Sequence, residues 1–498
     1  MRVLFIATEL GPWVKVGGLG DFVGSLPKAL RARGIDARVV IPAHSGVLRR
    51  APSPTRIASF PIEHAGGAMT AEVFASELDG VPVYLVSGAP IPPESIVYTG
   101  RMDEEGRRFT FFSIAALELC RHLEQRPDVV HCHDWHTAVV PWMLRARRTD
   151  ADFASITSLL TIHNLPYTGL GAEAELRSFG IDGSSDERVP PELRGAPMAL
   201  GLIAADRIST VSAGYAREIL TAEHGAGFDA LLRSRRAELH GIPNGLDLAS
   251  WDPQTDPALD APGDRAKNRA VLRQELGLPA DGDPPIVAFV GRMVAQKGVD
   301  LVLGALRALR EERWQAVFLG TGEPWLESAV LSLAAEESGR VRARIGFDER
   351  LSRRIYAGAD LLLLPSRYEP CGMTQLIAMR YGAIPVARET GGLADTVRDL
   401  DLADAPTGVL FPEASAPSLA FAIRRALGWR SRPEKWAGLT RTAMAEDSSW
   451  ERSAAAYSEL YDEMAREAAS RAKADAASAA SDGVPSDEAS ELASGGGA

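Results

Sequence analysis

The chain has 498 residues, of which 46% are hydrophobic and 24% charged. Because a single hydrophobic core rarely grows beyond about 250 to 300 residues, we expect two domains. The 66 acidic and 54 basic residues give a formal net charge of -12, which argues against a nucleic-acid partner and favours a neutral partner such as a polysaccharide.

Short runs rich in Val, Ile and Leu alternate with helical patterns along the first half of the chain. They cover residues 3–8, 37–41, 81–86, 128–132, 158–162 and 207–211. The same rhythm returns at residues 286–290, 316–319, 341–345, 361–364, 384–387 and 408–411. The pattern predicts two doubly wound, Rossmann-like α/β domains. Such domains bind ligands beyond the carboxyl ends of their strands, so two facing domains form a cleft between them.

Composition indicates where the domains begin and end. Sequence rich in Pro, Asp and Gly interrupts the pattern between residues 251 and 285, so we assign residues 1–245 to the first domain and 246–449 to the second. Residues 450–465 carry apolar side chains on one helix face, which predicts a last helix. Residues 466–498 hold no aromatic side chain and many Ala, Ser and Gly, which predicts a disordered tail.

Cysteine content and hydropathy bear on the compartment. The widely spaced Cys120, Cys132 and Cys371 predict neither a disulfide framework nor a zinc ribbon. No apolar run reaches the roughly 18 residues of a membrane span, and the apolar start of the chain is too short for a signal peptide. We therefore expect a soluble, cytoplasmic protein with no membrane partner.

The first strand leads into a loop, residues 15–20 with the sequence KVGGLG, that opens a helix. Free N–H groups and the positive end of a helix attract phosphate, and glycine lets a phosphate approach the backbone. Lys15 adds a positive charge. On the loop alone, glycines that merely turn the chain are an equally good interpretation.

A matching strand, loop and helix in the second half favour the phosphate interpretation. Arg292 and Lys297 follow the strand at residues 286–290, and a further glycine loop, residues 320–324, ends the next strand. A guanidinium and an ammonium at a strand's carboxyl end suit a diphosphate, and both interactions strengthen as a leaving group becomes more negative. The alternative is a pair of ordinary surface cations.

Two more polar loops follow strands. Glu369 lies in the loop after residues 361–364, where a carboxylate can bind sugar hydroxyls, whereas Cys371 is as easily a small packing residue. In the first domain, residues 131–136 (HCHDWH) resemble a metal-binding cluster, but no partner motif completes a tetrahedral site. Asp134 is interpreted as an N-cap of the next helix, a role compatible with catalysis. His163 and Asn164 end the following strand.

Together these motifs resemble bacterial glycogen synthases and plant starch synthases over residues 1 to about 465. The resemblance rests on segments 15–19, 133–136, 161–165, 241–247, 291–298, 320–324 and 369–375. It implies the GT-B fold, with the helix at 450–465 crossing back to the first domain. It also implies transfer of glucose from ADP-glucose to an α-1,4-glucan such as glycogen, with retention of configuration and without a metal or other cofactor.

The resemblance assigns roles to individual residues. Asp134, His163, Arg292, Lys297 and Glu369 are implied in catalysis, with Asp134 beside the acceptor. Lys15, Gly18, Arg292 and Lys297 are implied to hold the diphosphate. The full set of implied substrate-binding residues is Lys15, Gly17, Gly18, Asp21, Asn164, Asn244, Gly291, Gly322, Cys371, Gly372, Met373 and Thr374.

The chain departs from the family pattern in places. Val16 replaces a usual threonine, and the segment 87–107 lacks the Asp-Arg-Pro-Gly sequence of many relatives, which leaves acceptor length undefined. Ile377 stands where many other retaining transferases have a second glutamate, which fits this branch. A GT-B transferase using UDP-glucose or another acceptor, and a non-catalytic glucan-binding homologue, remain alternatives. The sequence is compatible with a homo-oligomer.

Overall fold

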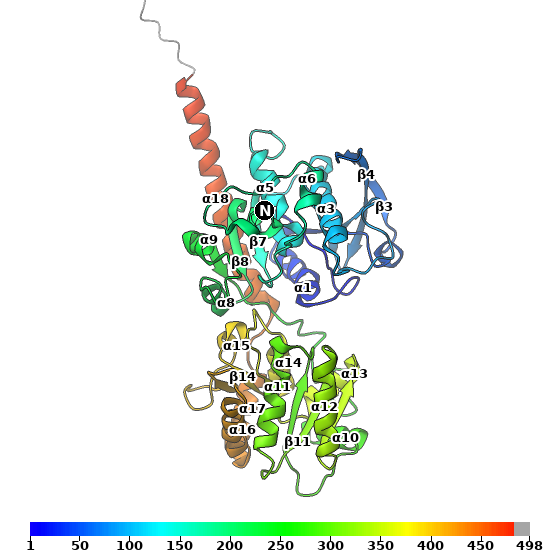
Figure 1. The fold of residues 1–498 in the computed structure, drawn as a ribbon, viewed down its shortest axis with the longest axis vertical. Coiled ribbons are helices and arrows are strands. Elements are labelled where there is room, and N and C mark those ends of the chain that lie inside the picture. Colours follow the sequence, from blue (N-terminus) through cyan, green and yellow to red (C-terminus); the bar gives the residue numbers. More distant parts are fainter. Residues whose placement is uncertain (483–498) are drawn as a thin grey trace, which may run out of the picture.

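The computed structural model describes residues 1–482, with side chains as far as Arg471. Figure 1 shows two lobes, one above the other, and the chain crosses between them near residues 246 and 448. The two crossing segments pair, because the Leu246 N–H donates to the Ser448 carbonyl at 2.6 Å. Each lobe has its own sheet, as the two-domain prediction requires.

The first sheet belongs to the upper lobe. Its strands are β1 (Arg2–Ile6), β2 (Asp36–Pro42), β3 (Thr55–Ile62), β4 (Met69–Leu78), β5 (Val81–Ser87), β6 (Val129–His133), β7 (Thr157–Ile162), β8 (Arg207–Thr210) and β9 (Leu239–Gly241). Within residues 1–482 the order is β3-β4-β5-β2-β1-β6-β7-β8-β9. Neighbours are parallel apart from the β3–β4 and β4–β5 pairs.

The second sheet is parallel throughout. Its strands are β10 (Ile286–Val290), β11 (Gln315–Gly320), β12 (Val341–Ile345), β13 (Leu361–Leu364), β14 (Ile384–Arg388) and β15 (Val409–Phe411). Their order in the described chain is β12-β11-β10-β13-β14-β15. The chain order reverses between β10 and β13, where Val287 lies opposite Leu361. Ligands of doubly wound folds bind at such a switch point.

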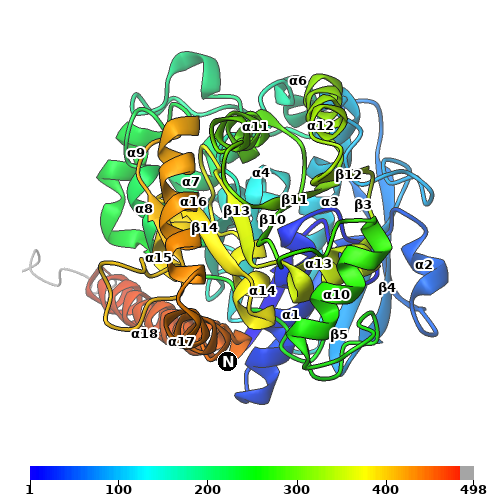
Figure 2. The ribbon, with the colours of Figure 1, turned by 90° about the horizontal axis from the view of Figure 1, so that it is seen from below.

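Helices cover both faces of each sheet. The first lobe has α1 (Gly18–Ala32), α2 (Val47–Arg50), α3 (Met102–His122), α4 (Asp134–Thr137), α5 (Val139–Ala146), α6 (Glu173–Ser178), α7 (Pro197–Ala204), α8 (Ala213–Glu218), α9 (Asp229–Ser234) and α18 (Trp450–Asp482). The second has α10 (Arg265–Leu276), α11 (Val299–Ala308), α12 (Pro324–Glu336), α13 (Glu349–Gly358), α14 (Thr374–Tyr381), α15 (Gly391–Thr396), α16 (Ala416–Arg430) and α17 (Pro433–Met444). In Figure 2, α11 and α12 lie on one side of the second sheet, and α13 and α14 on the other.

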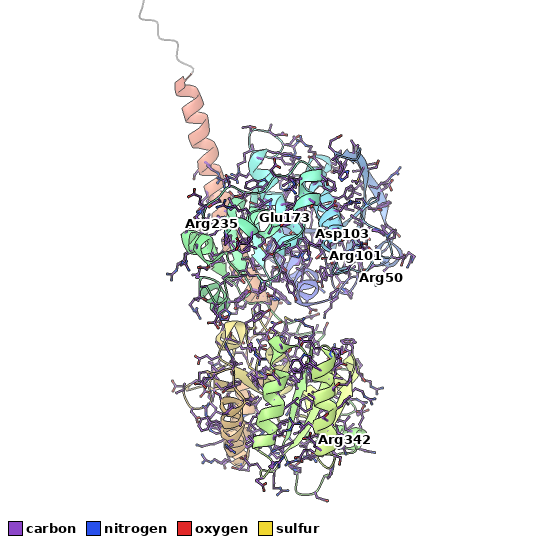
Figure 3. The ribbon with its side chains drawn as sticks, in the orientation of Figure 1. Arg50, Arg101, Asp103, Glu173, Arg235 and Arg342 are labelled. Carbon is purple, nitrogen blue, oxygen red and sulfur yellow. The ribbon has the colours of Figure 1, made fainter. Side chains whose placement is uncertain are left out.

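Local sequence explains where the helices begin and end. Asp348 caps α13 by accepting the Leu351 N–H at 2.9 Å, and Asp264 caps α10 by accepting the Lys267 N–H at 3.0 Å. Gly277 ends α10 with a φ of +62°, a left-handed conformation that glycine adopts without a Cβ clash. Arg342 then donates to the freed Leu276 carbonyl at 2.7 Å, and Arg235 donates to the Leu202 carbonyl at 2.6 Å. Figure 3 labels both arginines, Arg235 in the upper lobe and Arg342 in the lower.

The apolar core follows this layering. One buried cluster lies in the second domain, and two flank the first sheet. The face packed against α1 also receives the predicted apolar face of the last helix. The buried residues of that face are Trp450, Ala454, Tyr457, Leu460, Tyr461 and Met464. The last helix, α18, therefore packs with the first domain, although it follows the second domain in the chain.

Each predicted run forms a strand, with ends shifted by no more than two residues. The sequence pattern missed β3, β4 and β9. The β3 strand lies at the edge of its sheet and most of its side chains are exposed or half-buried, so it carries little of the apolar pattern of a buried strand. None of the helices within residues 1–482 is both long and apolar enough to cross a membrane.

The prediction of a disordered tail over residues 466–498 is wrong for its first part. The α18 helix continues to Asp482, and in Figure 1 it projects beyond the first lobe. Its Ala, Arg, Lys and Glu content has high helix propensity, and Glu467 pairs with Arg207 of β8. The composition argument considered burial only and left helix propensity out. Residues 483–498 of the predicted tail lie outside the described residues.

Candidate active site

The predicted phosphate loop lies after β1, at the start of α1. A buried carboxylate holds part of it: Glu9 Oε2 accepts the N–H groups of Val16 at 2.7 Å and Gly17 at 3.0 Å. The N–H groups of Val16 and Gly17 are therefore not free to bind a phosphate. The N–H groups of Gly18 and Leu19, which open α1, have no acceptor among residues 1–482.

The loop at residues 15–20 leaves open space beside Gly17 and Gly18, the glycines expected to let a phosphate approach the backbone. A Cβ added at Gly17 or Gly18 meets no atom within 4 Å, so neither glycine is required by packing. Lys15 and Asp21, both implied in donor binding, form an ion pair with Nζ and Oδ1 2.7 Å apart. Lys15 is half exposed, so the pair can open at little cost in free energy.

The second half of the predicted clamp follows β10. Lys297 Nζ lies 2.5 Å from Glu369 Oε2, and the Ser366 hydroxyl donates to the same oxygen at 2.9 Å. The structure thus brings together two residues that lie 72 positions apart, because β10 and β13 are neighbours. Arg292 is exposed and makes no ion pair in the described chain; its guanidinium donates to Gln296 Oε1 at 3.4 Å.

Glycines around this loop differ in what they do. Gly291 has a φ of +152° and open space beside it, as a ligand contact would need. Gly322 has a structural task, since a Cβ there would lie 2.2 Å from the Met293 carbonyl oxygen. A contact of Gly322 with substrate remains a prediction.

The loop after β13 carries Glu369 into the start of α14. Gly372 adopts a φ of +70°, and Gln375 Nε2 donates to the carbonyls of Cys371 at 3.1 Å and Gly372 at 2.7 Å. Met373 is the N-cap residue of α14, and Thr374 is its first residue. Burial raises the pKa of the Cys371 thiol to about 12, so it is a neutral packing group at physiological pH.

His163 and Asn164 follow β7 and are held by Asp134. The carboxylate Oδ1 of Asp134 accepts the N–H of His163 at 2.8 Å and that of Asn164 at 3.2 Å. This corrects the interpretation of Asp134 as an N-cap: His133 precedes α4, and no side chain caps that helix. Burial raises the pKa of Asp134 to about 7, although the two N–H groups oppose the shift.

Two of the three histidines that resembled a metal cluster, His131 and His133, hydrogen-bond to other side chains, whereas the buried Nδ1 of His136 has no partner within the described residues. His131 shares hydrogen bonds with the hydroxyls of Tyr461 at 2.8 Å and Thr161 at 2.5 Å. His133 Nδ1 lies 3.1 Å from His163 Nε2. Burial lowers the pKa of His163 to about 3, so its imidazole is neutral. Of the partners, Thr161 lies in β7, His163 directly after it, and Tyr461 in α18.

Two amide oxygens near these loops lack partners. The side-chain oxygens of Asn164 and Asn244 are buried and accept no hydrogen bond within the described residues. Asn244 lies just before the first crossing between the lobes. Buried polar atoms are normally satisfied, so both oxygens fit acceptors for hydroxyl groups of a ligand.

The two domains touch beside the Glu369 loop. The Ser212 hydroxyl donates to the Pro370 carbonyl at 2.5 Å, and Glu218 accepts the Gly391 N–H at 2.8 Å. No hydrogen bond or ion pair among residues 1–471 joins the loop at 15–20 to Arg292 or Lys297. The two halves of the predicted clamp are therefore not in contact in this structure.

Sequence reasoning missed two residues at these strand ends. Glu9 supports the glycine loop, but nothing in a single sequence shows that its carboxylate turns back on the backbone. Phe347 follows β12 and is 89% exposed, next to Gly346, whose N–H binds the carbonyl of Gly320. An aromatic residue directly after a predicted strand of this fold is a signal that could have been used.

Hydrogen bonds hold residues 87–107, the segment that lacks the Asp-Arg-Pro-Gly sequence of many relatives. Glu105 accepts the N–H groups of Thr99 at 2.5 Å and Gly100 at 2.7 Å, and Arg108 donates to the Ile96 carbonyl at 2.8 Å. The Tyr98 hydroxyl donates to Glu9 at 2.7 Å. The segment thus forms the outer support of the glycine loop.

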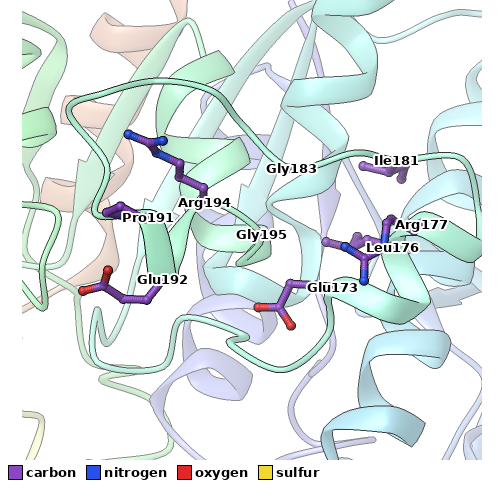
Figure 4. Close-up of a pocket in the computed structure, with 9 residues that line it drawn as sticks. All are labelled: Glu173, Leu176, Arg177, Ile181, Gly183, Pro191, Glu192, Arg194 and Gly195. Atoms are coloured by element: carbon purple, nitrogen blue, oxygen red, sulfur yellow. The ribbon is translucent and has the colours of Figure 1, made fainter.

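A separate cavity of about 290 Å³ opens in the first domain (Figure 4). Side chains of α6 line one side and residues 191, 192, 194 and 195 the other, with Glu173 and Arg194 on opposite walls. None of the predicted site residues lines it. It is therefore distinct from the loops at the strand ends.

Comparison with known proteins bears on both domains. Residues 2–234 match the starch synthase catalytic domain, and residues 273–441 match glycosyl transferases group 1. The chain is 43% identical to a glycogen synthase of Anaeromyxobacter dehalogenans (strain 2CP-C), over 93% of this chain and 99% of that one. It is 39% identical to a glycogen synthase of Geobacillus thermodenitrificans, over 93% and 98%.

Solved structures agree with this relationship. The catalytic domain of starch synthase IV from Arabidopsis thaliana, bound to ADP and acarbose, superposes with a TM-score of 0.84 and 33% identity, covering 93% of this chain and 99% of that one. A sucrose-phosphate synthase from Thermosynechococcus elongatus, at 21% identity and a TM-score of 0.60, shares the fold over 93% and 98%. The chain is a GT-B glycosyltransferase and belongs to the glycogen and starch synthase family.

Proposed function

We propose that this glycosyltransferase transfers glucose from ADP-glucose to the non-reducing end of an α-1,4-glucan, with retention of configuration and without a metal. The observation that carries the proposal is the Lys297–Glu369 pair at the switch point of the second sheet. An ammonium there can bind a diphosphate, while the carboxylate beside it can bind sugar hydroxyls.

The reaction needs no pair of catalytic carboxylates. The bond between glucose C1 and the β-phosphate oxygen breaks, and an acceptor hydroxyl oxygen bonds to C1 on the same face. The proton of that hydroxyl passes to the departing phosphate of ADP. Lys297 and Arg292 stabilise the negative charge that develops on this phosphate, together with the free N–H groups of Gly18 and Leu19 once the domains close.

The nucleotide is proposed to be ADP because the starch synthase IV structure is bound to ADP. In this chain, the exposed Phe347 ring after β12 offers a face on which a purine can stack. The three free cysteines fit a reducing cytoplasm, which is where we place the reaction.

The test is polymer labelling by purified protein. Incubation with glycogen, EDTA and either ADP-[¹⁴C]glucose or UDP-[¹⁴C]glucose should label the polymer in the presence of ADP-glucose. Label only from UDP-glucose would exclude the proposed donor. Absence of label from both donors would exclude the function, and a requirement for added metal would exclude the mechanism.

The proposed base-stacking role of Phe347 has its own measurement. Phe347→Ala should raise the KM for ADP-glucose about tenfold, since stacking of a base on an aromatic ring contributes roughly 1 to 3 kcal/mol. Leu402→Ala, at another exposed apolar side chain of the same domain, is the matched control and should leave the KM unchanged.

A further inference from the structure

The ring of His163 has a second ring directly against it. His133 Nδ1 and His163 Nε2 are 3.1 Å apart, so one of the two nitrogens donates a hydrogen bond to the other. His133 is fully buried, whereas His163 is half-buried. Burial lowers the pKa of both imidazoles, so each ring carries one proton.

The surroundings of His133 decide which ring donates. Its other nitrogen, Nε2, is buried without a partner among the described residues. If His133 accepted at Nδ1, its proton would sit on Nε2 as an orphaned buried donor. If it donates from Nδ1, only an acceptor lone pair is left unsatisfied. Orphaned buried N–H groups are the rarer of the two cases, so donation from His133 is favoured.

This choice fixes the proton of His163 as well. When His163 Nε2 accepts, its own proton must lie on Nδ1. That nitrogen makes no hydrogen bond to residues 1–471, and it is not among the buried atoms that lack partners, so solvent reaches it. His163 thus presents an N–H, and not a lone pair, on its accessible side.

The backbone of His163 is held by Asp134, the residue that follows His133. Successive side chains of a strand point to opposite faces, yet His133 and Asp134 both contact His163 or its N–H. The φ of +52° at Asp134 makes this possible, because the chain leaves the extended conformation at that residue. Aspartate tolerates the left-handed region better than most residues.

We propose that His133 is a positioning residue, which donates its Nδ1–H to His163 Nε2 and thereby directs the Nδ1–H of His163 toward hydroxyl groups of the donor sugar. The inference rests on the proposed function, since the hydroxyl groups belong to the glucose of ADP-glucose. Asp134 fixes the backbone of His163 in the same arrangement, while His133 fixes the tautomer of its ring.

The first test reads the tautomer directly and needs no activity. In ¹⁵N-histidine-labelled wild-type protein, long-range ¹⁵N–¹H correlation spectra should show the His163 proton on Nδ1 and the His133 proton on Nδ1. The His163 signals are assigned from a His163→Gln variant. A His163 proton on Nε2 would overturn the proposal, whether or not the protein makes polymer.

The second test separates positioning from packing. His133→Asn keeps an N–H close to the position of Nδ1, whereas His133→Leu removes it and retains a side chain of similar bulk. We expect kcat to fall at least tenfold in His133→Leu and less than threefold in His133→Asn, with the Kd for ADP within twofold of wild type in both. His224→Leu, a half-buried histidine after α8, is the control.

The outcomes are distinguishable from a failure of the proposed function. Equal losses of kcat in His133→Asn and His133→Leu would refute the tautomer role, since packing alone would then explain both. Wild-type protein without transferase activity would refute the proposed function, and the spectra would still decide whether His133 donates to His163.

Discussion

Replacing Lys297 by alanine removes the ammonium group on which the proposed phosphate clamp depends. The group lies 2.5 Å from Glu369 Oε2, and its side chain is 23% exposed. Loss of one preorganised donor to a developing negative charge typically raises the barrier by about 2.7 to 4 kcal/mol. We therefore expect kcat with ADP-glucose to fall by roughly 10² to 10³.

The same change also affects stability, which the assay must separate from catalysis. Alanine leaves the Glu369 carboxylate, only 10% exposed, with the Ser366 hydroxyl as its remaining side-chain partner. An unpaired buried carboxylate costs about 1 to 3 kcal/mol here, below the value for a fully buried pair because water reaches Lys297. The thermal midpoint of Lys297→Ala should therefore be lower than that of wild type.

A second variant distinguishes the two effects. Glu369→Gln in the Lys297→Ala background removes the unpaired charge, so it should restore most of the lost thermal stability and none of the lost kcat. Lys267→Ala is the control, because Lys267 is 75% exposed and pairs only with its own helix cap, Asp264. A loss in kcat below threefold for Lys297→Ala, or recovery of kcat in the double variant, would refute the assignment of Lys297 to the phosphate.

Three further predictions concern the first domain. Gly18→Ala should raise the KM for ADP-glucose at least tenfold without lowering the thermal midpoint, because a Cβ there meets no protein atom but fills the proposed phosphate space; a lower midpoint would show instead that the glycine serves the fold. The folded-state pKa of Asp134, about 7 against an ordinary 3.8, makes the folded protein lose stability as pH rises between these values, because the unfolded chain releases the proton first. The difference in thermal midpoint between Asp134→Asn and wild type should therefore shift in favour of the variant as the pH rises from about 4.5 to 8. Transferase activity should be lost in the variant. A difference in midpoint that does not change with pH would contradict the raised pKa. Tyr461→Phe deletes one of the two hydrogen-bond partners of buried His131 and should lower the free energy of unfolding by about 1 to 3 kcal/mol in urea titrations, against an unchanged value for the exposed Tyr167→Phe.

The alternation of apolar runs was sufficient to predict most strands of both sheets, because buried parallel strands and the helices between them are apolar over several consecutive residues. It failed for β3, where the edge of the sheet faces solvent and the apolar signal is weak. It also failed for residues 466–482 of α18, where helix propensity and the ion pair between Glu467 and Arg207 support a helix.

The candidate site, too, has features that the sequence predicts and features that depend on the tertiary structure. The order of loops after strands, with Gly18, Lys297, Glu369 and His163 at the strand ends, is a property of the sequence, since a doubly wound sheet places every such loop at one edge. The sequence does not show which of these side chains come into contact. Lys297 and Glu369 are 72 residues apart and pair only because the sheet makes β10 and β13 neighbours.

The turn at the end of β6 shows what the tertiary structure alone decides. The sequence placed Asp134 at a helix start, where an N-cap is the common role of an aspartate. The positive φ of Asp134 turns its carboxylate instead toward the N–H groups after β7, and burial then raises its pKa. Local sequence determines which elements form, because that depends on near neighbours, whereas hydrogen-bond partners and pKa values depend on groups brought close from distant parts of the chain.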